Sequence, residues 1–260
     1  MNNIAARFAL GTYRAFHFVH RGTQIVFEGI CLGLLPESVC DLMTELSYGS
    51  GRQYTNDAYL DSGFHFWEAL IVNRFFPPGS SVLVAAAGGG REMIALARAG
   101  FSVDGFECSR SMVSAGCAAI KARGLPVKLE WAPPSTVPPL SETYGGLIVG
   151  WNGYTYIAPR ARRLAFLGAL RAHLSPGSTV LISAAMRSGD FGAARWIAKI
   201  ANLVRKATFR DVVFEPGASF PGRPRHDFSW VQIESEVKEA GLTLLARYRW
   251  GPFFAVVCRW

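Results

Sequence analysis

The most informative segment of the sequence is Ser81-Val82-Leu83-Val84-Ala85-Ala86-Ala87-Gly88-Gly89-Gly90-Arg91-Glu92. Four apolar residues lead into a glycine-rich run, and apolar side chains then recur at helical spacing from Met93 onward. Glycine tolerates the positive φ of a tight turn, and the free N–H groups at a helix start face whatever lies above them. The pattern therefore predicts a strand, a turn and a helix that together cradle a nucleotide-like ligand.

The rest of the chain alternates between short apolar strands and helices. The expected strands cover 82–85, 103–106, 127–131, 146–150, 179–183, 242–248 and 253–259. The expected helices between them cover 91–99, 110–122, 160–173 and 231–240. Short apolar strands separated by helices are typical of a parallel sheet covered on both faces, and Trp250-Gly251-Pro252 predicts a closing hairpin. We therefore expect an α/β fold with a doubly wound, mostly parallel seven-stranded sheet whose last strand is antiparallel.

Two segments stand outside this alternation. Residues 1–76 are expected to form an N-terminal helical cap or lid, with a break at Pro36-Glu37-Ser38. Residues 77–260 then form the core. Within it, 184–230 interrupt the alternation after the fifth strand as a helical insert, with a helix over 191–206 that is amphipathic. We expect the cap and the insert to build the substrate pocket at the carboxyl edge of the sheet.

Composition limits the classes of partner and compartment. Half of the 260 residues are apolar, which allows a large core. The net charge of +8 is spread along the chain without a basic block, so nucleic acid is not the expected partner. Five cysteines without a CxxC pair indicate reduced thiols and a cytoplasmic location. No signal peptide is expected, and the apolar stretch 25–35 is short of the roughly 20 residues of a membrane span.

An acidic residue at the end of the second expected strand adds to the cradle. Glu107, in Gly105-Phe106-Glu107-Cys108-Ser109, can accept hydrogen bonds from both hydroxyls of a ribose. With the segments 82–90, 105–112 and 147–152 and the terminal hairpin, the chain from about residue 79 to residue 260 resembles a class I S-adenosylmethionine-dependent methyltransferase. The three-glycine fingerprint of dinucleotide oxidoreductases does not fit this turn from any starting residue.

The resemblance implies S-adenosylmethionine as the cofactor and a set of residues around the strand ends that bind it: Ala86, Ala87, Gly88, Gly90, Glu107, Cys108, Met112, Ala132, Gly150 and Trp151. Val84 and Ala86 depart from the family, which usually has an acidic residue and a glycine at these positions. The ammonium of the cofactor is therefore expected to use backbone carbonyls or another carboxylate, for which Glu92 and Glu68 are candidates. Arg91 is expected to pair with a carboxylate, and the cofactor's own is one candidate.

Methyl transfer from a sulfonium is an in-line displacement that depends on positioning and on a water-poor pocket. A base is needed only where the nucleophile must first lose a proton. His226, in the loop before the last helix, is the candidate base, and Tyr154 is the second candidate catalytic residue. A histidine that bonds only to backbone is the alternative for His226. Tyr54, Asn152 and Tyr156 are candidates for the substrate pocket, and no metal site is expected.

The sequence therefore predicts transfer of a methyl group to an oxygen or nitrogen atom of a small, apolar or aromatic acceptor, because both variable segments are rich in aromatic residues. Two alternatives stay open. One is a non-catalytic, S-adenosylmethionine-binding or regulatory protein of the same fold, prompted by Val84. The other is a peptide- or RNA-directed methyltransferase, prompted by the basic excess. Whether the cap closes its own pocket or that of a partner in a homodimer is also left open.

Overall fold

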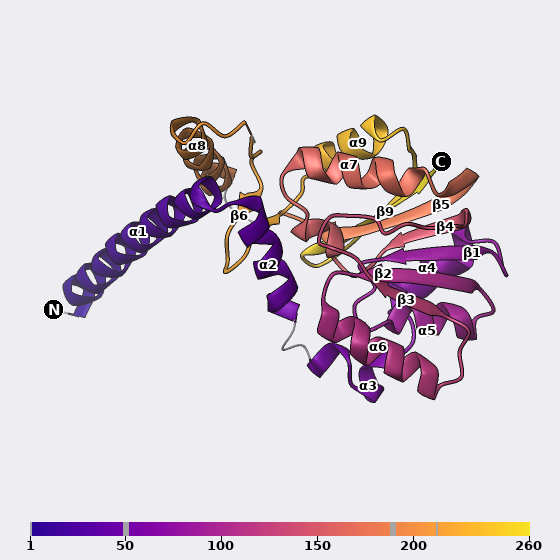
Figure 1. Cartoon of the computed structure of the whole chain (residues 1–260). Coiled ribbons are helices and arrows are strands. Elements are labelled where there is room, and N and C mark those ends of the chain that lie inside the picture. The colour runs from indigo at the N-terminus through magenta and orange to yellow at the C-terminus, as the bar shows by residue number, and fades with distance from the viewer. Residues whose placement is uncertain (1, 49–51, 188–190, 212) are drawn as a thin grey trace.

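A central seven-stranded sheet organises the molecule. The computed structural model describes residues 2–48, 52–187, 191–211 and 213–260 (Figure 1). The strands of the sheet are β1 (Ser81–Ala85), β2 (Ser102–Glu107), β3 (Lys128–Trp131), β4 (Tyr144–Val149), β5 (Leu174–Ala185), β8 (Thr243–Trp250) and β9 (Phe253–Arg259). Their order is β3-β2-β1-β4-β5-β9-β8, and β9 runs antiparallel to both of its neighbours. The predicted fold class is confirmed.

Helices cover both faces of this sheet, because the side chains of each buried strand alternate between two apolar cores. Leu83 and Ala85 of β1 pack into the core beneath α7 (Arg160–Arg171) and α9 (Trp230–Glu239). Val82 and Val84 point to the other face and pack beneath α4 (Phe66–Phe75), α5 (Arg91–Arg98) and α6 (Arg110–Ala122). This two-sided burial explains why the strands read as continuous apolar runs.

Some boundaries differ from the expected ones. β4 and β5 begin earlier than residues 146 and 179, so Ser175-Pro176-Gly177, a breaker between helix and strand by its composition, lies inside β5. The breaker instead coincides with an irregularity in pairing, since Tyr144 pairs with Leu174 and Gly146 with Thr179. The first part of β5 is held at the sheet end by the Gly177 N–H, which donates to the carbonyl oxygen of Trp260 at 2.7 Å.

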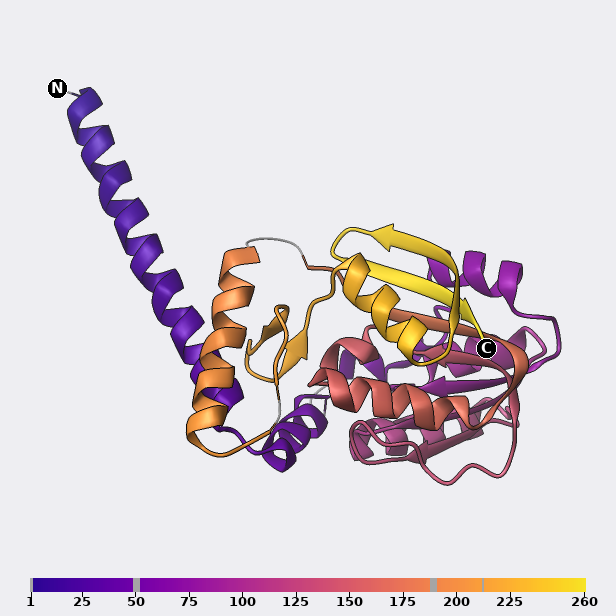
Figure 2. The ribbon, with the colours of Figure 1, turned by 90° about the horizontal axis from the view of Figure 1, so that it is seen from above.

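The N-terminal cap divides into parts with different partners. α1 (Asn2–Leu34) is one continuous helix, followed after the expected break by α2 (Glu37–Tyr48), η1 (Arg52–Tyr54) and α3 (Asp57–Leu60). α1 projects from the body and packs, over its C-terminal part, along α8 (Phe191–Ala207) of the insert (Figures 1 and 2). In contrast, α4 contributes Ile71 and Val72 to the sheet core. The described parts of the first 76 residues therefore pack against two separate regions of the molecule.

α1 and α8 enclose a small core of their own, apart from the sheet. Its members come from α1, from α8 and from the segment after α8 that leads into the hairpin of β6 (Ala218–Ser219) and β7 (Arg225–His226): Leu32, Ile197, Ala198, Ala201, Phe214, Ala218 and Phe220. The two helices approach closely at Gly29 and Gly33, where an added Cβ would lie 2.7 Å and 2.5 Å from the Cβ atoms of Ile200 and Val204. The glycines therefore allow this packing.

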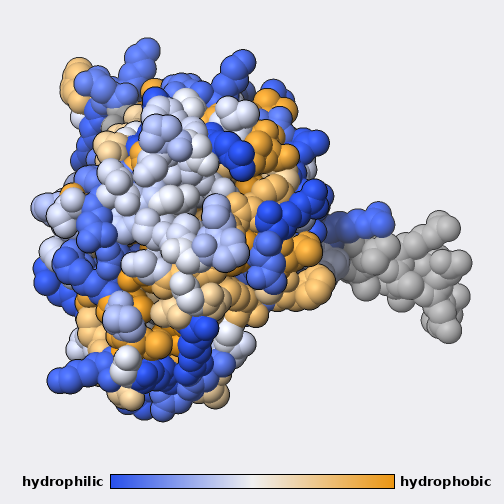
Figure 3. Space-filling model, turned by 90° about the vertical axis from the view of Figure 1, so that its right-hand side faces the viewer, coloured by the Kyte–Doolittle hydropathy of each residue, from blue (hydrophilic) through white to orange (hydrophobic). Residues whose placement is uncertain are grey.

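The side of the sheet region turned away from α8 carries hydrophilic and hydrophobic residues next to one another (Figure 3). Among the described residues, no helix combines the length and the apolar character needed to cross a membrane.

Candidate functional site

A cavity of about 320 Å³ lies at the carboxyl ends of β1, β2 and β4. The turn after β1 lines it with Ala86–Gly89, and β2 contributes Glu107. Residues from the cap and from the insert complete its wall: Thr44 of α2, Tyr54 of η1, Tyr59 of α3, and Arg223 and Arg225 at β7. The ligand-binding edge predicted for a doubly wound sheet thus carries a pocket, and both variable segments reach it.

The carboxylate of Glu107 is held in place by the backbone around it. Its side chain is buried, Oε1 accepts hydrogen bonds from the N–H groups of Cys108 and Ser109 at 2.8 and 2.9 Å, and Oε2 accepts one from Gly88 at 2.9 Å. A carboxylate oxygen can accept two hydrogen bonds, so Oε2 keeps capacity for a donor from the cavity. The carboxylate is therefore pre-oriented for a ligand hydroxyl.

A buried ion cluster forms the wall beside the turn. Arg91, only 1% exposed, donates to both oxygens of Glu68 at 2.8 and 2.7 Å and to Oε1 of Glu92 at 2.8 Å. Its remaining N–H groups donate to the carbonyl oxygen of Gly63 and the hydroxyl of Tyr59. All five donors of the guanidinium are thus engaged within the chain. Arg91 pairs with a carboxylate as expected, but the carboxylates are those of Glu68 and Glu92.

Glu92 is the member of this cluster that can meet a cation. It lines the cavity together with Arg91, whereas Glu68 lies behind them. Burial raises the pKa of the Glu92 carboxyl, and the nearby Arg91 opposes that shift. A cation that enters the cavity beside Glu92 would favour the ionised form and would be stabilised in return.

The turn adopts a conformation that its alanine does not favour. Ala86 has a φ of 55° at the position where the family has glycine, and Gly88 has a φ of 57°. Space for the Ala86 methyl group exists because residue 153 is glycine: a Cβ there would lie 2.5 Å from that of Ala86. Gly153 itself does not have a positive φ. The departure at Ala86 is therefore accommodated by a glycine 67 residues later in the sequence.

This pairing predicts a compensating double substitution. Gly153→Ala is expected to lower the free energy of unfolding by about 1–3 kcal/mol, because the new methyl group overpacks against Ala86. Ala86→Gly removes both the clash and the left-handed strain, so the double variant should recover most of that loss. Urea unfolding of the four proteins measures the cycle. Gly168→Ala, on an open face of α7, is the control and should be neutral or slightly stabilising. Purely additive effects of the two changes would contradict the pairing.

Asn152 places an unsatisfied polar atom at the cavity. It follows β4 with a φ of 56°, and its N–H donates to Oγ of Ser183 at 3.0 Å. The side chain is 7% exposed and lines the cavity, and its buried Oδ1 has no hydrogen-bond partner among the described residues. An unpaired buried oxygen lowers stability, so this position suits a ligand that brings an N–H or O–H group.

The structure brings most of the predicted site residues together around the cavity. Those that line it are Tyr54, Ala86, Ala87, Gly88, Glu107, Met112, Trp151, Asn152 and Tyr156. Four predicted cofactor residues do not line it. Gly90 is the N-cap residue of α5 and faces Ile120, Gly150 packs against the Ala86 carbonyl, and Ala132 is buried. Cys108 supports Glu107 through its backbone N–H.

Neither candidate catalytic residue lines the cavity. Tyr154 is fully buried, and its hydroxyl donates to Oε2 of Glu236 at 2.7 Å. His226 is 2% exposed, lies edge-on to Phe228, and its Nε2 has no hydrogen-bond partner in the described part of the chain. Burial lowers the pKa of His226 well below its usual value, and two nearby arginines lower it further. The structure therefore gives no support to a catalytic role for either, because both side chains are enclosed in protein.

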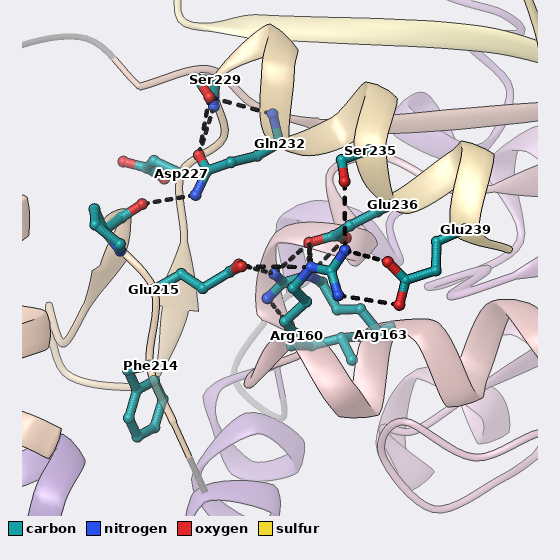
Figure 4. Close-up of polar contacts among 12 residues, drawn as sticks. Arg160, Arg163, Phe214, Glu215, Asp227, Ser229, Gln232, Ser235, Glu236 and Glu239 are labelled. Carbon is teal, nitrogen blue, oxygen red and sulfur yellow. Dashed lines mark hydrogen bonds and ion pairs between the residues drawn. The ribbon is translucent and has the colours of Figure 1, made fainter.

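Tyr154 instead belongs to a buried ionic network between α7 and α9. Arg160 and Arg163 converge on Glu236, with Glu215 and Glu239 on either side (Figure 4). Arg163 donates to Glu236 through Nη2 at 2.6 Å and through Nε at 2.9 Å. Both side chains are nearly inaccessible to solvent, so the network ties the two helices together without reaching the cavity.

Several lining residues had no signal in the sequence. Phe253 enters from the terminal hairpin, and Arg223 places its guanidinium 3.6 Å from the ring centroid of Tyr156. Arg225, also at the cavity, pairs with Asp227. Spacing could not reveal these residues, because the terminal hairpin and the segment at β7 are far from the glycine turn in the sequence.

Solved structures of methyltransferases share the architecture of this chain. No family model matches the chain, and no curated protein matches it. Among solved structures, an S-adenosylmethionine-dependent methyltransferase from Clostridium acetobutylicum is similar with a TM-score of 0.58 at 13% identity, over 80% of this chain and 96% of that one. The 1,6-didemethyltoxoflavin-N1-methyltransferase of Burkholderia thailandensis is similar with a TM-score of 0.58 at 17% identity, over 86% and 88%. A glycopeptide N-methyltransferase is similar with a TM-score of 0.53 at 18% identity, over 73% and 87%. Strand order, the antiparallel last strand and these similarities agree that this chain has the fold of the class I S-adenosylmethionine-dependent methyltransferases.

Proposed function

We propose that the protein binds S-adenosylmethionine in this cavity and transfers its methyl group to an oxygen or nitrogen atom of a small acceptor. The observation that carries the proposal is the buried carboxylate of Glu107, oriented by three backbone N–H groups beside the glycine turn. That arrangement suits a ribose whose hydroxyls donate to the carboxylate. The cofactor supplies an electrophilic methyl group on its sulfonium.

The residues around the cavity fit the remaining parts of such a cofactor. Met112 lines the same cavity as Glu107 and would offer an apolar, polarisable contact to the nucleoside. The turn from Ala86 to Gly88 lets the backbone approach the amino-acid part closely. Glu92 would hold the ammonium group, in place of the acidic residue that the family has at Val84. Val84 itself is fully buried in the apolar core of the sheet, so its side chain does not contact a ligand in the cavity.

The acceptor would occupy the part of the cavity that the variable segments enclose. Tyr54, Trp151, Tyr156 and Phe253 line this space with aromatic surface. Such a wall favours an apolar or aromatic acceptor and excludes water from the displacement. A small acceptor is also supported by the similar Burkholderia enzyme, whose structure holds 1,6-didemethyltoxoflavin and S-adenosylhomocysteine. Asn152, with its unpaired Oδ1, would accept a hydrogen bond from the cofactor or the acceptor and orient it.

Two measurements test the proposal. Calorimetric titration with S-adenosylmethionine and S-adenosylhomocysteine should show binding of both. Incubation with methyl-labelled cofactor and a panel of phenols, carboxylates, amines and peptides should then transfer label to a small member of the panel. No affinity of the wild-type protein for either cofactor form would overturn the proposal. Binding without turnover on the whole panel would favour the non-catalytic alternative, and labelling of the peptides alone would favour the macromolecular one.

A further inference from the structure

The projecting part of α1 exposes an apolar face that its own chain leaves uncovered. Every side chain from Thr12 to Gln24 is exposed to solvent. Large apolar residues are prominent among the exposed side chains of α1: Tyr13 (60%), Phe16 (68%), Phe18 (81%), Val19 (62%), Val26 (47%), Phe27 (61%), Ile30 (38%) and Leu34 (49%). An exposed apolar surface of this extent marks an interaction site.

Seven of these eight apolar residues of α1 gather along one side of the helix, and Phe18 lies on the other side. Most of them follow the 3.6-residue period: Tyr13, Phe16, Val19, Val26, Phe27, Ile30 and Leu34. Arg14 and Arg21 fall on roughly the opposite side, where Glu28 is buried and its Oε2 accepts the N–H of Phe220 at 2.8 Å. A long helix with aromatic residues on one side and basic residues on the other is typical of helices that lie in a membrane interface.

α8 and the segment after it also expose large apolar and basic side chains. Trp196 and Leu203 are 58% and 68% exposed, and Phe209, just beyond the helix, is 95% exposed. Lys199 and Lys206 are exposed between them, and α8 contains no acidic residue. Over residues 12–34 of α1 and the whole of α8, Glu28 is the one acidic residue, and it is buried. The surface is therefore basic as well as apolar, which complements an anionic layer.

A second copy of the chain fits this surface less well than a lipid layer does. His20 and Thr23 lie in the middle of the apolar stripe of α1, where a coiled coil of two copies would bury them in its seam. A second copy would also bring the basic residues of α8 against their equivalents, which is unfavourable. An anionic bilayer accommodates both the polar residues in the stripe and the basic residues of α8, because interfacial helices keep polar residues at the headgroups.

We propose that the exposed apolar side of α1, together with the exposed apolar and basic side chains of α8, binds the surface of an anionic phospholipid membrane. α1 would lie in the interface, with Phe16 and Phe27 among the inserted side chains and Lys199 and Lys206 near the headgroups. The proposal is independent of the proposed enzymatic activity, because its residues lie outside the cavity.

Vesicle flotation with the full chain tests this proposal. The protein should float with vesicles that contain phosphatidylglycerol in phosphatidylcholine, and much less with phosphatidylcholine alone. High salt should weaken the binding, because charges near the surface are screened. The double substitution Phe16→Ser and Phe27→Ser should reduce binding at least about tenfold, since two aromatic side chains no longer insert. Lys199→Glu with Lys206→Glu should abolish the preference for phosphatidylglycerol.

A matched control and a second method keep the test decisive. Phe66→Ser removes an 86% exposed phenylalanine from α4, in the sheet region, and should leave flotation unchanged. Thermal unfolding should be similar for all variants, because each residue is exposed. Absence of flotation at low salt, or an equal loss in Phe66→Ser, would overturn the proposal. So would a stable dimer in sedimentation that Phe16→Ser with Phe27→Ser dissociates, in a protein that does not float.

Discussion

Glu236→Ala is expected to lower the free energy of unfolding by about 3–5 kcal/mol, among the largest effects of any single substitution in this chain. Glu236 is inaccessible to solvent and accepts hydrogen bonds from Arg163 and from the hydroxyl of Tyr154. Its removal leaves the guanidinium of Arg163, 1% exposed, buried without its closest carboxylate. A buried charge that loses its partner is far more costly than an exposed pair that separates.

Glu239→Ala is the matched control for this substitution. Glu239 lies on the same helix, is 53% exposed, and pairs with Arg160 at 2.7 Å. Because water screens an exposed pair, its loss should change the free energy of unfolding by less than about 1 kcal/mol. Chemical denaturation of both variants measures the difference. A loss below about 1 kcal/mol in Glu236→Ala would show that Arg163 finds another partner.

Glu107→Ala is expected to weaken the binding of S-adenosylmethionine by about 1.5–3 kcal/mol, or roughly 10- to 150-fold. The reason is the loss of charge-assisted hydrogen bonds from the ribose hydroxyls to a carboxylate that the protein holds in place. The same substitution frees the N–H groups of Gly88, Cys108 and Ser109, so the turn also becomes less ordered. Titration calorimetry at constant pH and salt measures the affinity.

Two comparisons separate these contributions. Glu107→Gln keeps the shape and part of the backbone hydrogen bonding but removes the charge, so its affinity should fall between those of wild type and Glu107→Ala. Glu130→Ala removes an acidic residue on the neighbouring strand β3 that does not line the cavity, and should leave the affinity unchanged. An unchanged affinity in Glu107→Ala would remove this residue from the proposed site.

Several features of the fold were predictable from local pattern. The run Val82–Ala85 is apolar because β1 is buried on both faces, and the following glycines permit the positive φ that the turn requires. The pattern of apolar strands also predicts Glu107 at the ligand-binding edge, because Glu107 ends β2 and the carboxyl ends of parallel strands share one edge of the sheet. Periodicity and turn chemistry are properties of neighbouring residues, so the sequence displays them directly.

The partners of individual side chains were not predictable in this way. Arg91 carries the same charge whether it meets a ligand or Glu68, and only the fold shows that α4 brings Glu68 beside it. His226 and Tyr154 have the chemistry of catalytic residues, yet the packing of α9 and the insert encloses both. In each case the deciding contact joins residues on different elements.

The sheet, the glycine-rich turn after β1 and the acidic residue at the sheet edge were all predictable from the amino-acid sequence, because they depend on hydrophobic period and backbone conformation over short segments. Three features became visible in the folded chain alone: how Gly153 accommodates Ala86, which carboxylates pair with Arg91, and which residues of the cap and insert line the cavity. The folded chain also shows that α1 leaves the body with its apolar side uncovered. The burial of a side chain and its hydrogen-bond partners depend on elements that are distant in the sequence and adjacent in the fold, and a local sequence pattern does not specify which elements are adjacent.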